Sequence, residues 1–262
     1  MRFSLIILMG VVCAEKAPSS TRWRFHPLIA GRFYFDFTQA AMENKFISLT
    51  QPIYNYLLEK RSDAHDELLL ELRRETAALG DISTMQIGPE QGAFMSLLAA
   101  VSGAWRALEI GTFTGYSALC IARGLQNGAT LTCLDQSGEW TQIAQRFWQR
   151  AHIADRIELR LGDANETLQT LVNEGSAPFD FVFIDAYKID YENYFDIVMP
   201  HLPPNALVIF DNMLREGRVA EPPLTDPSDI AIDALNTRLA NDARLETVLI
   251  PVGDGLLLCR VK

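Results

Sequence analysis

Asp185, Asp211 and Asn212 have the side chains of a cation site. Asp185 and Asp211 each follow directly on an apolar stretch typical of a buried strand. If these strands are neighbours, their axes lie about 4.8 Å apart, so two carboxylates and an amide oxygen could converge on one ion. An all-oxygen set of this kind suits a hard divalent cation such as Mg²⁺, with positions left for water or substrate oxygens.

Lys188 stands three residues after Asp185 and would lie over the same spot. A lysine amine beside a phenol held on the ion could act as a general base. The alternative is an ordinary surface lysine in a loop, and the spacing alone does not separate the two interpretations.

Acidic residues also end the other predicted strands. The full set that follows apolar strands is Glu109, Asp135, Asp163, Asp185 and Asp211. In an open α/β sheet, the carboxyl ends of the strands form the ligand crevice. Strand ends favour Asp for turn chemistry as well, but five acids at one edge indicate a binding site.

Leu108–Ser117 has the pattern of a strand that enters a helix through a tight glycine turn. Such a turn can cradle a nucleotide-like ligand, although an ordinary corner that needs its glycines for sterics is the alternative. Phe113 replaces the middle glycine of the dinucleotide pattern. Asp135, 24 residues after Gly111, stands where nucleotide-binding sheets hydrogen-bond a ribose diol, and its charge argues against NADP.

Alternating strands and helices must bring these residues together. The apolar pattern predicts strands at Ala104–Ile110, Thr130–Leu134, Ile157–Leu161, Phe179–Ile184, Ala206–Phe210, Leu245–Ile250 and Gly255–Val261. It predicts helices at Ile47–Leu58, Asp66–Leu79, Pro89–Val101, Ala118–Leu125, Trp140–Ala151, Asn165–Val172, Tyr191–Leu202 and Ile230–Leu239. This alternation indicates a doubly wound, mostly parallel α/β sheet of seven strands. Only Pro251–Asp254 joins the last two strands, so they must form an antiparallel hairpin.

Composition excludes several classes of partner. The 262 residues carry a formal net charge of −10 and no basic stripe, which argues against a nucleic-acid partner. No apolar run is long enough for a transmembrane helix. The cysteines are scattered and lie mainly in apolar patterns, as expected for buried thiols of a reducing compartment: Cys13, Cys120, Cys133 and Cys259. The histidines lie outside the motifs and are expected on the surface: His26, His65, His152 and His201.

The first 41 residues do not fit the rest, so we divide the chain into an extension, 1–41, and a catalytic domain, 42–262. Met1–Ala14 has the outline of a secretory signal, with Val12–Ala14 as a candidate cleavage site. The alternative is a natural start at Met42 with a translated leader upstream. We expect a cytoplasmic protein, and the signal-like segment leaves export open.

Four motifs in the same order resemble the cation-dependent class I O-methyltransferases, the family of caffeoyl-CoA and catechol O-methyltransferases. They are Met85–Gly92, Leu108–Ser117, Phe181–Lys188 and Phe210–Asn212. The ending Pro251–Leu256 resembles the bacterial branch, and the resemblance covers about 42–262. A parallel sheet closed by an antiparallel last strand is also typical of class I methyltransferases.

The resemblance implies S-adenosylmethionine in the first crevice and a divalent cation, Mg²⁺ above all, in the second. By position, Asp185, Asp211 and Asn212 would bind the metal, and Lys188 would be the base. The implied cofactor-binding residues are Met85, Ile87, Glu109, Gly111, Thr112, Ser117, Asp135, Ala164, Asp185 and Tyr187, with Asp163 near the adenine. This chain departs from the plant pattern at three of its positions, Ile87, Tyr187 and Glu216, which puts acyl-CoA specificity in doubt.

The implied reaction is metal-assisted methyl transfer to a small phenolic acceptor. The acceptor would chelate the cation through two adjacent oxygens, Lys188 would take the proton, and the phenolate would attack the sulfonium methyl. Met213–Asp226 is the expected acceptor loop, and the family implies a homodimer. Two other functions stay open: an NAD-linked oxidoreductase on a similar sheet, and a non-catalytic, secreted binding protein.

Overall fold

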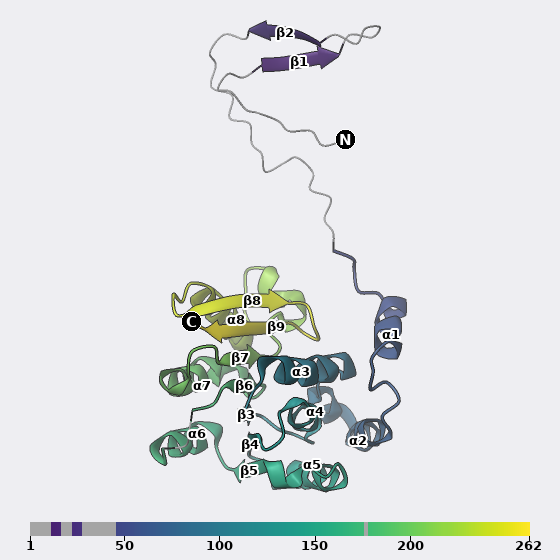
Figure 1. Ribbon diagram of the computed structural model, residues 1–262, viewed down its shortest axis with the longest axis vertical. Helices are drawn as coiled ribbons and strands as arrows, with labels where there is room; N and C mark the ends of the chain where they lie inside the picture. Colours follow the sequence, from purple (N-terminus) through teal and green to yellow (C-terminus); the bar gives the residue numbers. More distant parts are fainter. Residues whose placement is uncertain (1–11, 17–22, 28–45, 176–177) are drawn as a thin grey trace. The chain divides into compact units, whose positions relative to one another are not determined.

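The computed structural model describes residues 12–16, 23–27, 46–175 and 178–262, in two units, Met1–Ser48 and Leu49–Lys262 (Figure 1). In the first unit, β1 (Val12–Lys16) pairs antiparallel with β2 (Trp23–Pro27). The sequence pattern did not predict this pair. Val12–Ala14, the candidate cleavage site, lies in β1, while the rest of the signal-like segment and Met42 lie outside the described residues.

The second unit is built on a seven-stranded sheet with the order β5-β4-β3-β6-β7-β9-β8. The strands are β3 (Arg106–Ile110), β4 (Thr130–Asp135), β5 (Ile157–Leu161), β6 (Phe181–Ile184), β7 (Leu207–Phe210), β8 (Leu245–Ile250) and β9 (Leu256–Val261). The first five in this order are parallel, and β9 runs antiparallel between β7 and β8. The predicted fold class and the closing hairpin are therefore confirmed.

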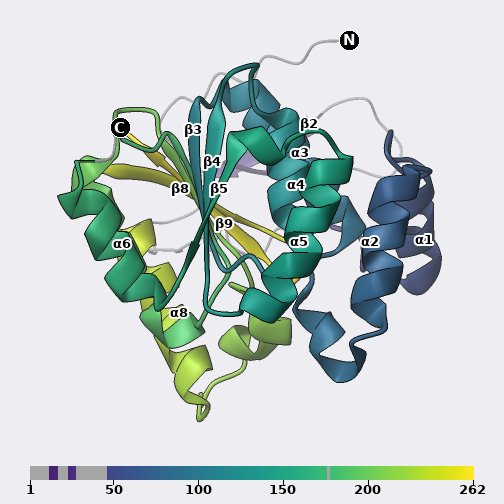
Figure 2. The same cartoon turned by 90° about the horizontal axis from the view of Figure 1, so that it is seen from below.

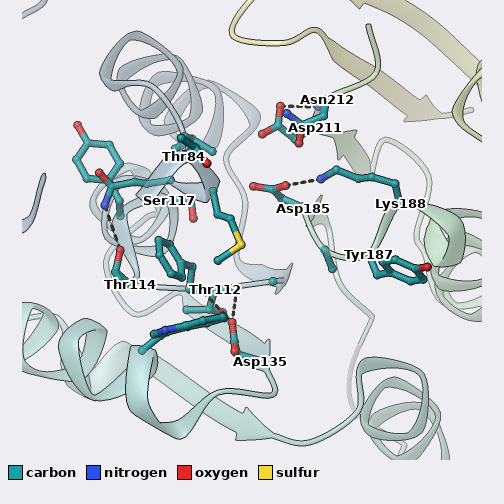
Figure 3. A pocket seen from close by; sticks show the side chains of 18 of the residues that line it. Thr84, Thr112, Thr114, Ser117, Asp135, Asp185, Tyr187, Lys188, Asp211 and Asn212 are labelled. Carbon is teal, nitrogen blue, oxygen red and sulfur yellow. Dashed lines mark hydrogen bonds and ion pairs between the residues drawn. The ribbon is translucent and has the colours of Figure 1, made fainter. Parts of the chain in front are cut away.

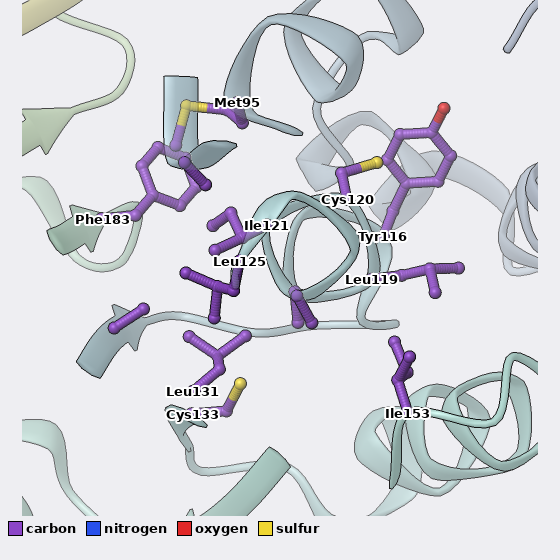
Figure 4. Packing of buried hydrophobic residues seen from close by; sticks show 14 of the residues in the cluster. Met95, Tyr116, Leu119, Cys120, Ile121, Leu125, Leu131, Cys133, Ile153 and Phe183 are labelled. Carbon is purple, nitrogen blue, oxygen red and sulfur yellow. The ribbon is translucent and has the colours of Figure 1, made fainter. Parts of the chain in front are cut away.

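Helices cover both faces of the sheet (Figure 2). The helices are α1 (Gln51–Glu59), α2 (Glu67–Ala77), α3 (Pro89–Ser102), α4 (Tyr116–Gly124), α5 (Gly138–Arg150), α6 (Ala164–Asn173), α7 (Tyr191–Val198) and α8 (Pro227–Ala240). One apolar cluster joins α2–α5 to the sheet, and a second joins α6–α8 to its other face. In the first cluster, Ile121 of α4 and Leu125, which directly follows this helix, lie beside Leu131, and Met95 lies next to Phe183 (Figure 4).

The central strands are buried on both sides, which is why they read as continuous apolar runs in the sequence. All four residues of β6 are buried, as are the last four of β3. Strands covered by helices on both faces have no solvent side on which to place polar residues. Each apolar run ends at the carboxyl end of its strand, and the polar residues of the site follow there.

The bounds of two helices, α1 and α7, differ from those predicted from the sequence. The sequence pattern predicted a helix from Ile47, but residues 46–50 are not helical and α1 begins at Gln51. Pro52 stands in its first turn, where proline is favoured because the missing N–H is not needed. The predicted helix at Tyr191–Leu202 is also shorter, because α7 ends at Val198 and a 3₁₀ turn follows.

The remaining composition-based expectations concern cysteine, histidine and membrane spans. Cys120, Cys133 and Cys259 are buried free thiols, as expected. His65, His152 and His201 are exposed, and the side chain of His26 lies outside the described ones. Among the described helices, none has the length and apolar character needed to cross a membrane.

Candidate active site

The carboxyl ends of the parallel strands meet at one edge of the sheet. The ladder of backbone hydrogen bonds continues one residue past the strands: the N–H of Gly111 donates to Leu134 (2.9 Å), and that of Asp185 to Ile110 (2.9 Å). In the same way, Asp211 donates to Ile184 (3.0 Å). A cavity of about 840 Å³ opens at this edge, within the size range of small-molecule sites.

All the predicted site residues except Glu109 and Asp163 line this cavity. They are Met85, Ile87, Gly111, Thr112, Ser117, Asp135, Ala164, Asp185, Tyr187, Lys188, Asp211 and Asn212. Figure 3 shows Asp185, Lys188, Asp211 and Asn212 at one end, and Thr112 and Asp135 at the other. The cavity therefore has two ends with different chemistry.

The glycine turn at one end is set by close backbone contacts. Gly111 has φ +91°, and a Cβ on it would lie 2.0 Å from the carbonyl oxygen of Asp185. Any side chain would therefore force the two strand ends apart. The turn brings Thr112 to the cavity wall, together with Ser117 in the first turn of α4.

Asp135 holds this turn in place. One oxygen of its carboxylate, Oδ2, accepts the N–H groups of Thr112 (3.0 Å) and Phe113 (2.7 Å). The other, Oδ1, accepts the N–H of Ser137 (2.7 Å) at the start of α5. The sequence pattern pointed only to a ligand contact, and the structure adds a role in shaping the loop that would carry the ligand.

Two aromatic side chains form a wall beside Asp135. Phe113 adopts a left-handed conformation with φ +52°, and its ring meets that of Trp140 edge to face at 5.1 Å. Both rings line the cavity. The sequence pattern treated Phe113 as a replaced glycine and overlooked Trp140, whose position near Ser137 was the available signal. Aromatic rings next to a carboxylate suit a nucleoside.

The segment that carries Met85 and Ile87 is fastened over the turn. The Gln86 amide nitrogen donates to the hydroxyls of Thr76 (2.8 Å) and Thr114 (3.1 Å). Thr76 lies on α2 and Thr114 in the glycine turn, so Gln86 ties both to the segment before α3. Met85 remains 47% exposed at the rim.

At the other end, Lys188 pairs with one of two acids. The Lys188 Nζ donates to Asp185 Oδ1 (2.8 Å) and to the hydroxyl of Tyr191 (2.7 Å). Asp211 follows the neighbouring strand and is only 3% exposed. Burial, together with the charge of Asp185, raises the pKa of Asp211 well above its ordinary value. This end of the cavity therefore favours further positive charge.

The donors at this end fit a hard divalent cation. Within the described part of the chain, no group of three or more His, Cys, Asp or Glu side chains could hold an ion. The cavity lining does contain two carboxylates, those of Asp185 and Asp211, and the Asn212 side chain, whose amide oxygen is a third possible ligand. An all-oxygen, incomplete set of this kind suits Mg²⁺, which keeps several positions for water and substrate oxygens.

Two of the five predicted edge acids do not line the cavity. Glu109 lies inside β3, is fully buried, and has the thiol of Cys133 3.6 Å from its Oε2. Its burial raises the pKa of Glu109 to about 8, which favours the neutral acid. Asp163 caps α6 by accepting the N–H groups of Asn165 (3.0 Å) and Glu166 (3.2 Å). The expectation that Glu109 follows its strand is therefore wrong, while contacts of Glu109 and Asp163 with the cofactor stay predictions.

The predicted acceptor loop contributes little of its length to the site. Of Met213–Asp226, Arg215 and Glu216 line the cavity, beside Asp254 of the closing hairpin. Arg215 and Asp254 were not singled out from the sequence. The unusual density of charge in Arg215–Arg218 was the available signal.

Comparisons with known proteins place the chain among methyltransferases. The profile of a family described as O-methyltransferase matches residues 59–262. A probable caffeoyl-CoA O-methyltransferase 2 of Dictyostelium discoideum is 34% identical over 81% of this chain and 92% of that protein. A catechol O-methyltransferase of Niastella koreensis is 35% identical, covering 75% and 91%. The crystal structure of an O-methyltransferase from Bacillus cereus in complex with SAH has a TM-score of 0.75 and 33% identity, covering 80% and 97%.

Proposed function

The chain belongs to the O-methyltransferase family, and we propose that it methylates a hydroxyl of a catechol-like or caffeoyl-type phenol held on a divalent cation. The methyl donor of this enzyme is S-adenosylmethionine. Family membership argues against the two alternative functions, a nicotinamide oxidoreductase and a non-catalytic binding protein. The observation that carries the proposal is that one cavity joins the Asp135 end to the Asp185 and Asp211 end.

The donor is proposed to lie at the Asp135 end. The glycine turn and Ser117 line the cavity at this end, and the rings of Phe113 and Trp140 suit the adenine. Asp135 uses three of its acceptor positions on the turn and Ser137. A carboxylate can accept about four hydrogen bonds, so capacity remains for the ribose.

Replacing Asp135 with Ala should weaken binding of S-adenosylmethionine by at least about tenfold, because charge-assisted hydrogen bonds contribute about 1.5–3 kcal/mol each. Titration calorimetry of the variant measures this loss. The matched control is Asp226→Ala, which removes an acid that caps α8 and does not line the cavity. The control should lose only stability, about 0.5–2 kcal/mol. Equal dissociation constants for Asp135→Ala and the wild type would place the ribose elsewhere.

The cation is proposed to lie between Asp185, Asp211 and Asn212. A divalent cation bound there supplies a Lewis acid that lowers the pKa of a coordinated phenol. The chain's own residues supply the rest. Asp185 and Asp211 would balance the charge of the cation. Lys188, held by hydrogen bonds to Asp185 and Tyr191, would lie beside the phenol. Once neutral, its Nζ can accept the phenol proton.

Catalysis then depends on position. Because the donor and the acceptor occupy the two ends of one cavity, the protein holds the nucleophile and the methyl group close together. Such positioning supplies about 7–11 kcal/mol in favourable cases. Tyr187, 61% exposed at the rim, offers an aromatic wall for the acceptor ring.

Assays over catechols, flavonoids and caffeoyl thioesters test this function. With Mg²⁺, we expect methyl transfer to at least one catechol-type acceptor. A saturating chelator should abolish turnover and leave the affinity for S-adenosylmethionine nearly unchanged, because the two ligands use different ends of the cavity. Full turnover in chelator would contradict the cation.

We also propose a homodimer. Leu97 and Val101 of α3 are 63% and 76% exposed and lie one turn apart on the same helix face. Exposed apolar side chains on one helix face are candidates for an interface. Light scattering of the full chain measures its mass in solution, and a monomer at every concentration would contradict the dimer.

A cytoplasmic location is proposed as well. The described cysteine side chains are buried and unpaired, as is usual in reducing compartments. Cell fractionation of the full chain tests this, and recovery outside the cytoplasm would contradict it.

A further inference from the structure

Arg215 introduces a positive charge into the acceptor end of the cavity. It follows Asn212 by three residues, lines the cavity, and has a side chain that is 19% exposed. The 3₁₀ segment that it opens, Arg215–Ala220, packs against α8, which also contacts the 3₁₀ turn Lys188–Asp190. Arg215 therefore lies on the side of Lys188, away from Asp135.

The backbone around Arg215 is held in an unusual conformation. Arg215 and Glu216 have φ of +50° and +57°, in the left-handed region that non-glycine residues rarely adopt. The closing hairpin supports this conformation, because the N–H of Leu214 donates to Asp254 O (2.9 Å) and that of Glu216 to Asp254 Oδ1 (2.5 Å). Residues in such conformations cluster at ligand sites.

A buried carboxylate orients the guanidinium. Asp229, in the first turn of α8, is 3% exposed and accepts the Arg215 Nε at 2.9 Å. It also accepts the Nε of Arg218 at 2.7 Å. One acid thus serves two arginines. Within the described part of the chain, the two terminal nitrogens of Arg215 donate to no protein acceptor, so its fork can receive an anion.

The acids around Arg215 have other partners. Asp254, which also lines the cavity, accepts the N–H of Glu216 (2.5 Å) and the Asn212 amide (3.5 Å), and the proposed cation would offset the charges of Asp185 and Asp211. Glu216 also lines the cavity, but its side chain is 78% exposed and pairs with Arg218 at 3.1 Å. Burial raises the pKa of the Tyr191 hydroxyl well above its usual range and the charges of Asp185 and Asp211 add to this rise, whereas the charge of Arg215 opposes it. The guanidinium is therefore electrostatically coupled to the hydroxyl that contacts Lys188.

We propose that Arg215 selects acceptors that carry a carboxylate on the phenolic unit, and so prefers hydroxylated aromatic acids to neutral or cationic catechols. This inference rests on the proposed function. A planar guanidinium whose two terminal nitrogens are available matches a carboxylate in a bidentate pair. Because Arg215 lies inside the cavity, the anion must be close to the ring. The phosphates of a coenzyme A thioester are separated from the ring by the long pantetheine arm.

The test compares caffeate with methyl caffeate, which differ in one negative charge. The wild type should show a higher kcat/KM for caffeate. In Arg215→Gln, kcat/KM for caffeate should fall about ten- to a hundredfold, while that for methyl caffeate stays within about twofold. The ester also serves as the folding and cation control, since a misfolded or cation-free variant would lose both activities.

The matched control is Arg218→Gln. Arg218 pairs with the same Asp229 but does not line the cavity, and either substitution leaves Asp229 with one arginine. Arg218→Gln should therefore keep the wild-type preference for caffeate. Equal loss of caffeate and ester activity in Arg215→Gln would overturn the inference, as would a wild type that prefers the ester or caffeoyl-CoA to caffeate. If the wild type methylates no catechol at all, the proposed function itself fails.

Discussion

Replacing Lys188 with Met should lower the rate of methyl transfer by about 10²–10⁴-fold near neutral pH, the usual loss for a missing general base. The Nζ of Lys188 lies 2.8 Å from Asp185 and 2.7 Å from the Tyr191 hydroxyl, beside the proposed cation. Its removal takes away the nearest proton acceptor and leaves Asp185, Asp211 and Asn212 in place. Cation and acceptor binding should therefore survive.

The dependence on pH separates a base from a positioning group. The deficit of Lys188→Met should shrink as the pH rises, because the phenolate then forms without help. The matched variant is Lys188→Arg, which keeps a cation next to Asp185 but cannot be deprotonated. It should be as slow as Lys188→Met at neutral pH. A deficit that is constant across the pH–rate profile, or near-normal activity of Lys188→Arg, would show that Lys188 only positions the substrate.

Replacing Asp211 with Asn should abolish cation-dependent turnover. Loss of an outer partner of a metal ligand already costs about 10–100-fold in metal affinity or activity, so loss of a direct ligand should weaken Mn²⁺ or Mg²⁺ binding by at least about 100-fold. Titration with Mn²⁺, followed by electron paramagnetic resonance, measures the cation directly. Binding of S-adenosylmethionine should change little, because Asp211 lies at the far end of the cavity from Asp135 (Figure 3).

Stability provides the control for this variant. Asp211 is buried beside Asp185, and burial with this neighbouring charge raises the pKa of Asp211. Removing an uncompensated buried charge relieves desolvation and repulsion. Without added cation, Asp211→Asn should therefore melt no lower than the wild type. Cation affinity equal to that of the wild type would show that the ion is held elsewhere, and a much lower melting temperature would show that Asp211 stabilises the cation-free fold.

The sequence alone determined the architecture and the location of the site. Strands buried on both faces need continuous apolar runs, and such runs are visible without knowledge of their neighbours. The residue that follows each run must emerge at the carboxyl edge, so the local pattern placed Asp185 and Asp211 at that edge. The condition that brings them together, that their strands are neighbours, is met by the pairing of β6 with β7. The short connection before β9 similarly required a hairpin. For this reason most of the predicted site residues, though not Glu109 or Asp163, were found around one cavity.

Depth within the sheet and contacts between distant elements were decided only by the tertiary structure. Glu109 and Asp135 look alike in sequence, but strand register buries the first inside β3 and places the second at the edge. The insertion of β9 between β7 and β8 is set by pairing such as Leu207 with Arg260, far apart in the chain. Arg215 becomes part of the cavity because Asp229, 14 residues later, is buried on α8 and holds its Nε. Such contacts depend on how separate elements pack against one another, and apolar periodicity along a single chain does not encode them.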